Sequence, residues 1–399
     1  MKQHGIFKNL AGETVFNSQA ATLVFLTGVA FKLSAAPAMI SEEFGSSTFW
    51  AFALYSTIDV LIATLVFCFA RKNGDALLIA TNSGAYRMIA LFATVFLTLK
   101  GIFNFSYASS YLTHELFEGL EPSLIYLLFL LPVVYLGARG IRPLSRTAEV
   151  FFPIIFLTII LNLVFLKTKT DFARVLPVFS KAPAQLAKVF PRYGLWLADM
   201  LPFAFVKIKD KRLPYLTIGI TGTWLIVNLV ALLGVAIYGN ALKTVTDLLI
   251  RIAGFNQLSK DVGRTEWTNL LAVLTMSIIS LAFSYFGALA ACKRAVKTDM
   301  PIKIAFPLAI LLVVLIVPSA QTVTDFATGK FGYAMFATAL ALPLLMTLEY
   351  ARQRSKLKNV ARRLEDEYLP NRPTEDAIDS RRSGVLDGFK NLPSKRQKV

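Results

Sequence analysis

Residues 25–37 read FLTGVAFKLSAAP, and they place a single lysine, Lys32, inside a stretch that is otherwise apolar enough to lie in lipid. An ammonium group at membrane depth costs at least about 2.5 kcal/mol unless another group compensates its charge. The stretch therefore predicts a membrane-spanning chain. It also predicts that Lys32 has a partner elsewhere within the membrane.

The composition of the whole chain is that of an integral membrane protein. Of its 399 residues, 55% are hydrophobic and 32 are phenylalanine, a larger apolar share than soluble domains usually carry. The net charge of +17 does not indicate nucleic-acid binding, because the excess lies in short loops and in a C-terminal tail. Cys68 and Cys292 lack the spacing of a disulfide framework or a metal site, so neither a metal nor a cofactor is expected. Residues 1–16 lack the pattern of a removable signal peptide.

Ten stretches are candidate membrane spans, since a helix needs about 20 mostly apolar residues to cross the hydrocarbon core. They are residues 17–40, 47–70, 86–112, 122–138, 148–166, 193–207, 215–239, 267–292, 302–320 and 331–349. An even number of crossings puts both termini on one side of the membrane. The predicted class is an all-α integral membrane protein with ten transmembrane helices.

The distribution of basic residues predicts the orientation. The loops 71–87, 139–147, 207–214 and 293–303 together hold 14 lysines and arginines, whereas the short loops that alternate with them hold only Lys330. By the positive-inside rule, the basic loops and both termini are cytoplasmic. The expected organisation is a cytoplasmic N-terminus (1–16), a ten-span permease domain (17–349) and a basic cytoplasmic tail (350–399) that is partly disordered.

Two spans carry signs of an interruption. Span one has Gly28 and Pro37 on either side of Lys32, and span six has Asp199 and Pro202 within about 14 apolar residues. A helix of that length rises only about 1.5 Å per residue and falls short of a hydrocarbon core of about 30 Å. Spans one and six are the first spans of two five-span halves, about 17–166 and 193–349. Because each half crosses the membrane an odd number of times, the second half has the opposite orientation to the first. Paired interruptions of this kind indicate a 5+5 inverted-repeat transporter with its site at the breaks; the alternative is a pair of kinks without function.

Four charged residues lie deep within the candidate spans, two basic and two acidic. Lys32 and Asp199 both lie toward the outer side of their spans, beside the predicted breaks, and are expected to pair. Asp59 and Lys100 lie near the membrane midplane and are expected to form a second pair. These four residues can serve as ion pairs that stabilise the fold or as groups that couple ligand binding to a proton.

Several stretches together resemble the spore-germination permease family, a branch of the amino acid-polyamine-organocation superfamily. They are the segment around Lys32, GARGIRPLSRTAEVFFPIIFL (137–157), DFARVLPVF (171–179) and GRTEWTNLLAVL (263–274). Members of this family are polytopic subunits of nutrient germinant receptors in endospore-forming bacteria. The likeness extends from residue 15 to about residue 350. The tail is longer than the family usually carries, and Asp199 stands where the branch often has glutamate.

The resemblance implies how the two breaks would bind a ligand. Backbone amides near four residues of span one would meet a substrate carboxylate, and backbone carbonyls of span six would receive an ammonium group beside Asp199. The residues concerned are Thr27, Gly28, Val29 and Ala30 in span one, and Leu197, Ala198 and Leu201 in span six. A small amino acid suits this geometry. Sodium-coupled relatives use hydroxyl groups of span eight, for which Ser280 and Ser284 are the candidates, whereas Lys32 or Lys100 can replace the cation.

The expected function is that of a permease, or of the ligand-sensing subunit of a receptor, in the cell membrane or the spore inner membrane. Its partners would be a small-molecule ligand such as an amino acid, the membrane lipids and the other subunits of a germinant receptor. The alternative is a structural membrane subunit that neither binds nor moves a ligand. An enzyme is disfavoured, because His4 and His114 are the only histidines and no hydrolase, zinc-protease or P-loop motif is present.

Overall fold

The computed structural model describes residues 14–80, 83–113, 121–166, 170–176, 183–208, 214–245, 247–254, 266–316 and 320–368. Most of the predicted N-terminal segment and the tail beyond Tyr368, including the part expected to be disordered, lie outside these residues. The chain divides into two compact units, Met1–Tyr350 and Ala351–Val399.

Helices make up almost all of the described chain. The α-helices are α2 (Asn17–Ser34), α3 (Ala36–Phe44), α4 (Thr48–Ala80), α5 (Gly84–Tyr111), α6 (Pro122–Ala138), α7 (Ile141–Val164), α8 (Pro183–Val189), α9 (Pro214–Tyr238), α10 (Leu248–Ala253), α12 (Glu266–Val296), α13 (Met300–Ile316), α14 (Ala320–Thr328) and α15 (Lys330–Tyr368). Short 3-10 helices are η1 (Gly45–Ser47), η3 (Phe172–Val175), η4 (Phe190–Trp196), η5 (Leu201–Phe205) and η6 (Gly239–Thr244). Strand β1 (Thr14–Val15) pairs in parallel with β2 (Lys207–Ile208).

Six segments of the described chain are long and apolar enough to cross a membrane: Ala36–Ala70, Gly84–Ser109, Ile141–Val164, Tyr215–Thr244, Thr268–Val296 and Lys330–Lys356. Two further apolar helices, α6 and α13, are shorter. The protein is therefore all-helical and multi-pass. The remaining two predicted spans, 17–40 and 193–207, coincide with α2–α3 and with η4–η5, and the count of ten spans stays a prediction.

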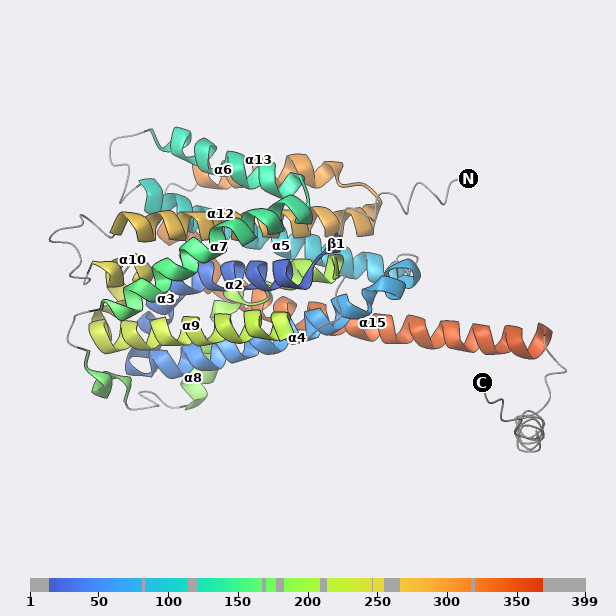
Figure 1. Cartoon of the computed structure of the whole chain (residues 1–399), viewed down its shortest axis with the longest axis horizontal. Coiled ribbons are helices and arrows are strands. Elements are labelled where there is room, and N and C mark those ends of the chain that lie inside the picture. Colours follow the sequence, from blue (N-terminus) through green and yellow to red (C-terminus); the bar gives the residue numbers. More distant parts are fainter. Residues whose placement is uncertain are drawn as a thin grey trace, which may run out of the picture. The chain divides into compact units, whose positions relative to one another are not determined.

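Helix α2 lies at the centre of the first unit, between α9 and α12 (Figure 1). All residues of α2 from Leu23 to Ser34 are buried. A helix that is apolar on every side lies either in a protein core or in lipid, and here protein surrounds it, because α7 and α10 also pack against α2. Helix α12 also packs against α5 and α6. This arrangement puts Lys32, near the end of α2, inside the helical bundle.

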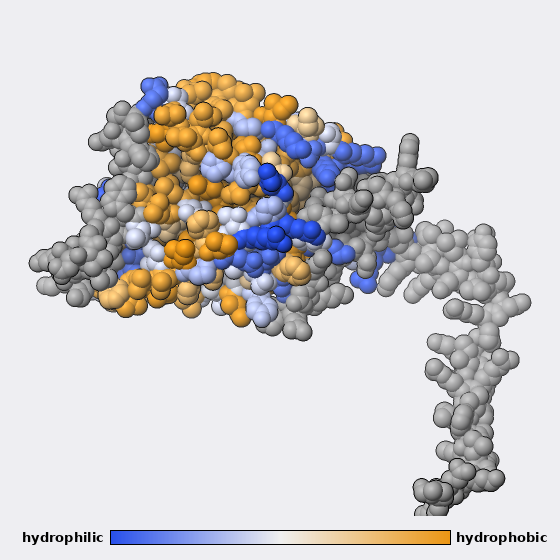
Figure 2. Space-filling view, turned by 45° about the horizontal axis from the view of Figure 1, so that its top comes forward, coloured by the Kyte–Doolittle hydropathy of each residue, from blue (hydrophilic) through white to orange (hydrophobic). Residues whose placement is uncertain are grey.

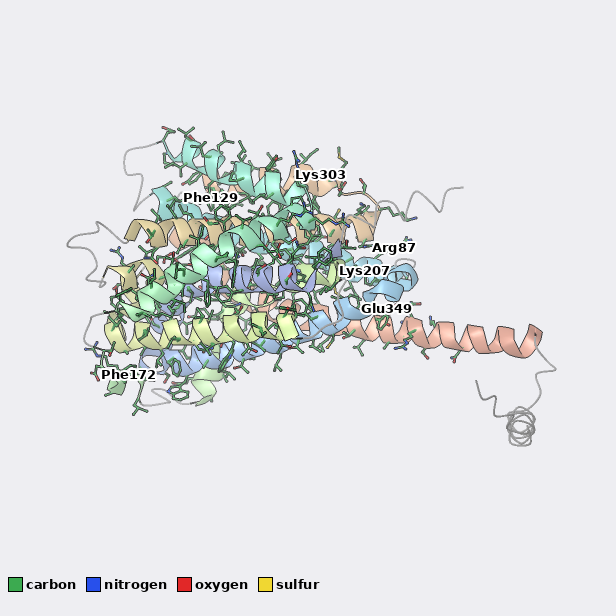
Figure 3. All side chains as sticks on the ribbon, in the orientation of Figure 1. Arg87, Phe129, Phe172, Lys207, Lys303 and Glu349 are labelled. Atoms are coloured by element: carbon green, nitrogen blue, oxygen red, sulfur yellow. The ribbon has the colours of Figure 1, made fainter. Side chains whose placement is uncertain are left out.

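The surface of the first unit matches a membrane environment. Hydrophobic residues cover much of the described face in Figure 2. Leucine, isoleucine, valine and phenylalanine side chains are exposed along α6, α7 and α13, where a soluble protein would carry polar groups. Figure 3 places Arg87, Lys207 and Lys303, which belong to three of the basic loops, toward one end of the helices, with Phe172 toward the other.

In the tail, apolar residues recur at helical spacing over residues 351–369, which predicts a helix on the cytoplasmic leaflet. In the structure, α15 continues as one helix to Tyr368. That helix prediction is confirmed for the described residues. Its association with the cytoplasmic leaflet stays a prediction.

Candidate functional site: a ring of buried charges at the break of the sixth span

The segment 190–208 contains no α-helix. Two 3-10 helices, η4 and η5, are separated by Leu197 to Met200, and Ala198 has a left-handed backbone with φ +60°. The local sequence explains the break, because Pro191 and Pro202 lack the amide hydrogen that an α-helix requires. Gly194 lets η4 lie directly on the backbone of Phe336 in α15, since a Cβ there would overlap that backbone. The predicted interruption of span six is therefore present.

Four charged side chains converge on this break from three helices and from the break itself. The Lys32 ammonium on α2 lies 2.6 Å from Asp59 Oδ2 on α4 and 2.5 Å from Asp199 Oδ2. The Lys100 ammonium on α5 lies 2.6 Å from Asp199 Oδ1. The side chains of both lysines are almost completely buried, at 2% and 1% exposed. Two positive and two negative charges make the cluster neutral overall.

One peptide group closes these contacts into a ring. Lys100 Nζ donates to the carbonyl of Leu197 at 2.5 Å, and the amide of Ala198 donates to Asp59 Oδ1 at 2.8 Å. The Leu197 carbonyl and the Ala198 amide belong to the same peptide bond. Both polar ends of this peptide are thus held by the charged residues, which we call the charge ring: Lys32, Asp59, Lys100, Asp199 and the peptide between Leu197 and Ala198. The ring links α2, α4 and α5 to the broken span.

The sequence-based pairing of the four charges was right for one pair and wrong for the other. Lys32 contacts Asp199, as predicted. Asp59 and Lys100 do not form the predicted second pair: Asp59 binds Lys32, and Lys100 binds Asp199. Depth was predicted by counting residues along straight helices, but Asp199 lies on a non-helical segment and faces both lysines. The result is one connected cluster instead of two separate pairs.

The predicted unwinding of span one at Thr27, Gly28, Val29 and Ala30 is wrong. All four residues lie within the continuous helix α2 and are buried. Their amides belong to the hydrogen bonds of the helix, and the Thr27 hydroxyl donates to the Leu23 carbonyl at 2.7 Å. The interruption lies later, at Ala35. Pro37 explains its position, because proline has no amide to donate to the carbonyl four residues earlier.

Gly28 serves packing in this structure. A Cβ at this position would lie 2.7 Å from Thr223 Cγ2 on α9 and 3.1 Å from Met200 Cε. The missing side chain therefore lets α2 approach both α9 and the broken span. The Thr27 hydroxyl lies 3.8 Å from the sulfur of Met200, so α2 contacts the segment next to the charge ring through this pair of residues.

The three predicted carbonyls of span six have different surroundings. The Leu197 carbonyl accepts from Lys100, and the Ala198 carbonyl accepts from the Leu201 amide at 3.1 Å. Leu201 itself is completely buried.

Ser280 and Ser284, the candidate hydroxyl ligands for sodium, are buried on α12. Among the described residues, no group of three or more histidine, cysteine, aspartate or glutamate side chains could hold a metal ion.

Contacts on the N-terminal side of the break were not predicted from the sequence. The Tyr55 hydroxyl on α4 donates to the carbonyl of Tyr193, and the Tyr193 hydroxyl donates to the carbonyl of Met39 on α3 at 3.0 Å. Arg192 forms an ion pair of 3.0 Å with Glu43 on α3. Tyrosine and arginine are common at membrane interfaces, so their identity alone gave no signal for these contacts.

The chain is similar to a known protein family over more than half its length. A family model described as "Spore germination protein" matches residues 86–324. No curated protein matches the chain significantly.

Solved transporters share the fold at low sequence identity. A mutant of the manganese transporter of Eremococcus coleocola is 13% identical, with 96% of this chain and 92% of that chain covered and a TM-score of 0.50. Mhp1, a nucleobase-cation-symport-1 family transporter in a closed conformation with bromovinylhydantoin bound, is also 13% identical, with 92% of this chain and 96% of that chain covered and a TM-score of 0.52. At this identity the similarity establishes a common fold and nothing about the ligand.

Proposed function

Because the chain belongs to the family of spore germination proteins, we propose that it binds a small amino acid or a similar metabolite at the break of the sixth span. The family and the permease-like fold agree with the resemblance found in the sequence, and the solved proteins that share the fold are transporters. Binding would serve either transport or ligand sensing during germination.

The charge ring is the observation that supports this site. Its peptide offers one amide and one carbonyl, each of which now contacts a charged side chain of the protein. The carboxylate of an amino acid can take the place of Asp59 at the Ala198 amide, or its ammonium group can take the place of Lys100 at the Leu197 carbonyl. The two polar groups of a trans peptide point in opposite directions, so one small amino acid replaces one of these contacts. A zwitterion adds no net charge to a neutral buried cluster, whereas a charged ligand would leave an uncompensated charge at high cost.

The sequence-based site is retained in part under this proposal. The charge ring contains Asp199 and the peptide between Leu197 and Ala198, and Leu201 lies directly beside it. Thr27 and Gly28 would contribute by packing against Met200 and Thr223. Val29 and Ala30 would contribute as part of the buried helix that carries Lys32. The proposed role of span one thus changes from binding the carboxylate to positioning a charged residue.

The proposed topology is ten crossings in two inverted five-span halves, about 17–166 and 193–349, with both termini in the cytoplasm. The basic loops support this orientation, because residues from three of them lie toward the same end of the helices (Figure 3). In an endospore-forming bacterium the proposed location is the spore inner membrane, where partner subunits of a germinant receptor would contact the protein. Residues 1–16 and the tail 350–399 would face the cytoplasm.

Thermal stability of the detergent-purified protein tests the proposed function. Amino acids, sugars and polyols are added one at a time, and a ligand is identified by a saturable rise in Tm, because a molecule that binds only the folded state stabilises it. The Asp199→Asn variant should lose most of this rise. The alternative function, a structural subunit without a ligand, predicts that no compound in the screen changes Tm.

A further inference from the structure

The side chain of Lys100 makes two contacts that a bound metal cation makes in many transporters. Its ammonium lies 2.5 Å from the Leu197 carbonyl and 2.6 Å from Asp199 Oδ1. In transporters with discontinuous helices, carbonyls freed by unwinding together with nearby oxygen ligands bind the coupling sodium ion. Here the carbonyl belongs to the broken span, and the carboxylate belongs to a residue two positions further along it.

The position of this ammonium is fixed by the helix that carries it. Helix α5 packs against α12, and the residue after Lys100, Gly101, lies so close to α13 that a Cβ there would be 2.5 Å from Phe306 Cζ. The lysine therefore reaches the break from a backbone that has little freedom to move. Its side chain is 1% exposed, so bulk water has almost no access to the ammonium.

The charge balance leaves no place for an additional cation. Lys32 and Lys100 already neutralise Asp59 and Asp199, and every carboxylate oxygen of the two aspartates has a partner in the ring. A free sodium ion at Asp199 would give the buried cluster a net positive charge. Buried charges without compensation are strongly destabilising.

From these contacts we propose that Lys100 is a built-in cation: its ammonium occupies a cation-binding position at the break of span six, so that the folded state there requires no free metal ion. The proposal concerns the ion and not the ligand, and it holds whichever molecule the protein binds. It goes beyond the proposed function because it states what stabilises the break before a ligand arrives.

The test compares cations in the absence of any ligand. Tm of the purified wild-type protein is measured in sodium, potassium and choline chloride at equal ionic strength. Tm of Lys100→Ala is then measured in the same salts and in ammonium and methylammonium chloride. Gly101→Ala is the matched control, because it disturbs the neighbouring residue of the same helix by steric overlap without removing a charge.

Wild-type Tm should be the same in all three salts. Lys100→Ala should have a lower Tm that rises saturably with sodium, ammonium or methylammonium but not with choline, which is too large to enter the space left by the side chain. Gly101→Ala should be destabilised without any such rescue. In the double variant Lys100→Ala/Asp199→Asn the rescue should vanish, because the carboxylate that binds the added cation is gone.

Two results would overturn the proposal. One is a saturable stabilisation of the wild-type protein by sodium or potassium over choline, which would assign a separate site for a free ion; this measurement decides the question even if Lys100→Ala does not fold. The other is a folded Lys100→Ala variant whose Tm no small cation raises.

Discussion

Lys32 is held by two carboxylates, and each of them also holds another group of the charge ring. Removing any one member therefore changes more than one contact. Lys32 lies between Asp59 and Asp199, so its loss leaves two buried acids with one remaining lysine. At the scale of single residues, the ring should show strong coupling between its members.

A double-mutant cycle measures this coupling. Lys32→Met should lower the stability of the folded protein by about 3–5 kcal/mol, because breaking a buried pair leaves an unpaired charge. Lys32→Met combined with Asp199→Asn should cost less than the sum of the two single changes, because contacting residues in one network do not act additively. The measurement is the Tm of the four purified proteins.

The exposed pair formed by Lys303 and Asp299 provides the control for this cycle. Their side chains are 41% and 31% exposed, with 3.2 Å between the charged atoms. Exposed pairs contribute about 1 kcal/mol or less, so Lys303→Met should change Tm little. Additive effects of Lys32→Met and Asp199→Asn would show that the two residues do not act together.

The sequence predicted these residues because so few charges lie within the spans. Lys32 and Asp199 could be paired from their similar depth. The assignment of Asp59 and Lys100 failed because residue counts give a depth along each helix and no direction around it. The sequence also gave no indication that the peptide between Leu197 and Ala198 joins the ring, since backbone groups are the same at every residue.

At the scale of elements, spans one and six use different structural features. Span six breaks where prolines and a left-handed residue interrupt the helix, which its short length and Pro202 predicted. Span one keeps its helix through Gly28, where the sequence predicted unwinding. A glycine in a membrane helix permits either a break or a close approach of a neighbouring helix, and only the position of α9 distinguishes the two.

Gly28→Ala should therefore destabilise the protein through packing. The new methyl group would lie 2.7 Å from Thr223 Cγ2, and overpacking of this kind typically costs about 1–3 kcal/mol. Thr223→Ser removes that Cγ2 atom while keeping the hydroxyl that donates to the Gly219 carbonyl, so Thr223→Ser should restore part of the Tm lost in Gly28→Ala. The measurement is the Tm of the two single variants and the double variant.

Gly84→Ala is the control for Gly28→Ala. Gly84 is the first residue of α5, and a Cβ there would meet nothing within 4 Å. The Tm of Gly84→Ala should equal that of the wild-type protein or be slightly higher, since alanine is a better helix former than glycine. If Thr223→Ser gives no rescue, the steric explanation for Gly28 is incorrect.

The left-handed backbone of Ala198 leads to a prediction about the break itself. A branched side chain is strongly disfavoured at φ +60°, whereas glycine adopts this conformation readily. Ala198→Val should lower Tm well below that of Ala198→Gly, and it should also weaken ligand binding because the Ala198 amide moves away from Asp59. Equal Tm values for the two variants would mean that the backbone at this position is not left-handed.

At the scale of the whole molecule, the predicted orientation can be tested at the two ends of α6. Glu121 and Arg139 flank this helix, and both are exposed. In a background of Cys68→Ser and Cys292→Ser, Glu121→Cys should react with a membrane-impermeant maleimide in intact cells, whereas Arg139→Cys should react only after permeabilisation, because basic loops are retained in the cytoplasm. The reverse labelling pattern would invert the proposed topology.

The central claim joins these scales: the charge ring at the break of span six is the ligand site of a permease-like membrane protein. A structure of the protein determined by cryo-electron microscopy with its ligand, once the Tm screen has identified one, tests this claim most directly. The account predicts ligand density against the Leu197–Ala198 peptide and the loss of at least one of the two contacts that Lys100 and Asp59 make with it. Ligand density elsewhere, with every contact of the ring intact, would contradict the account.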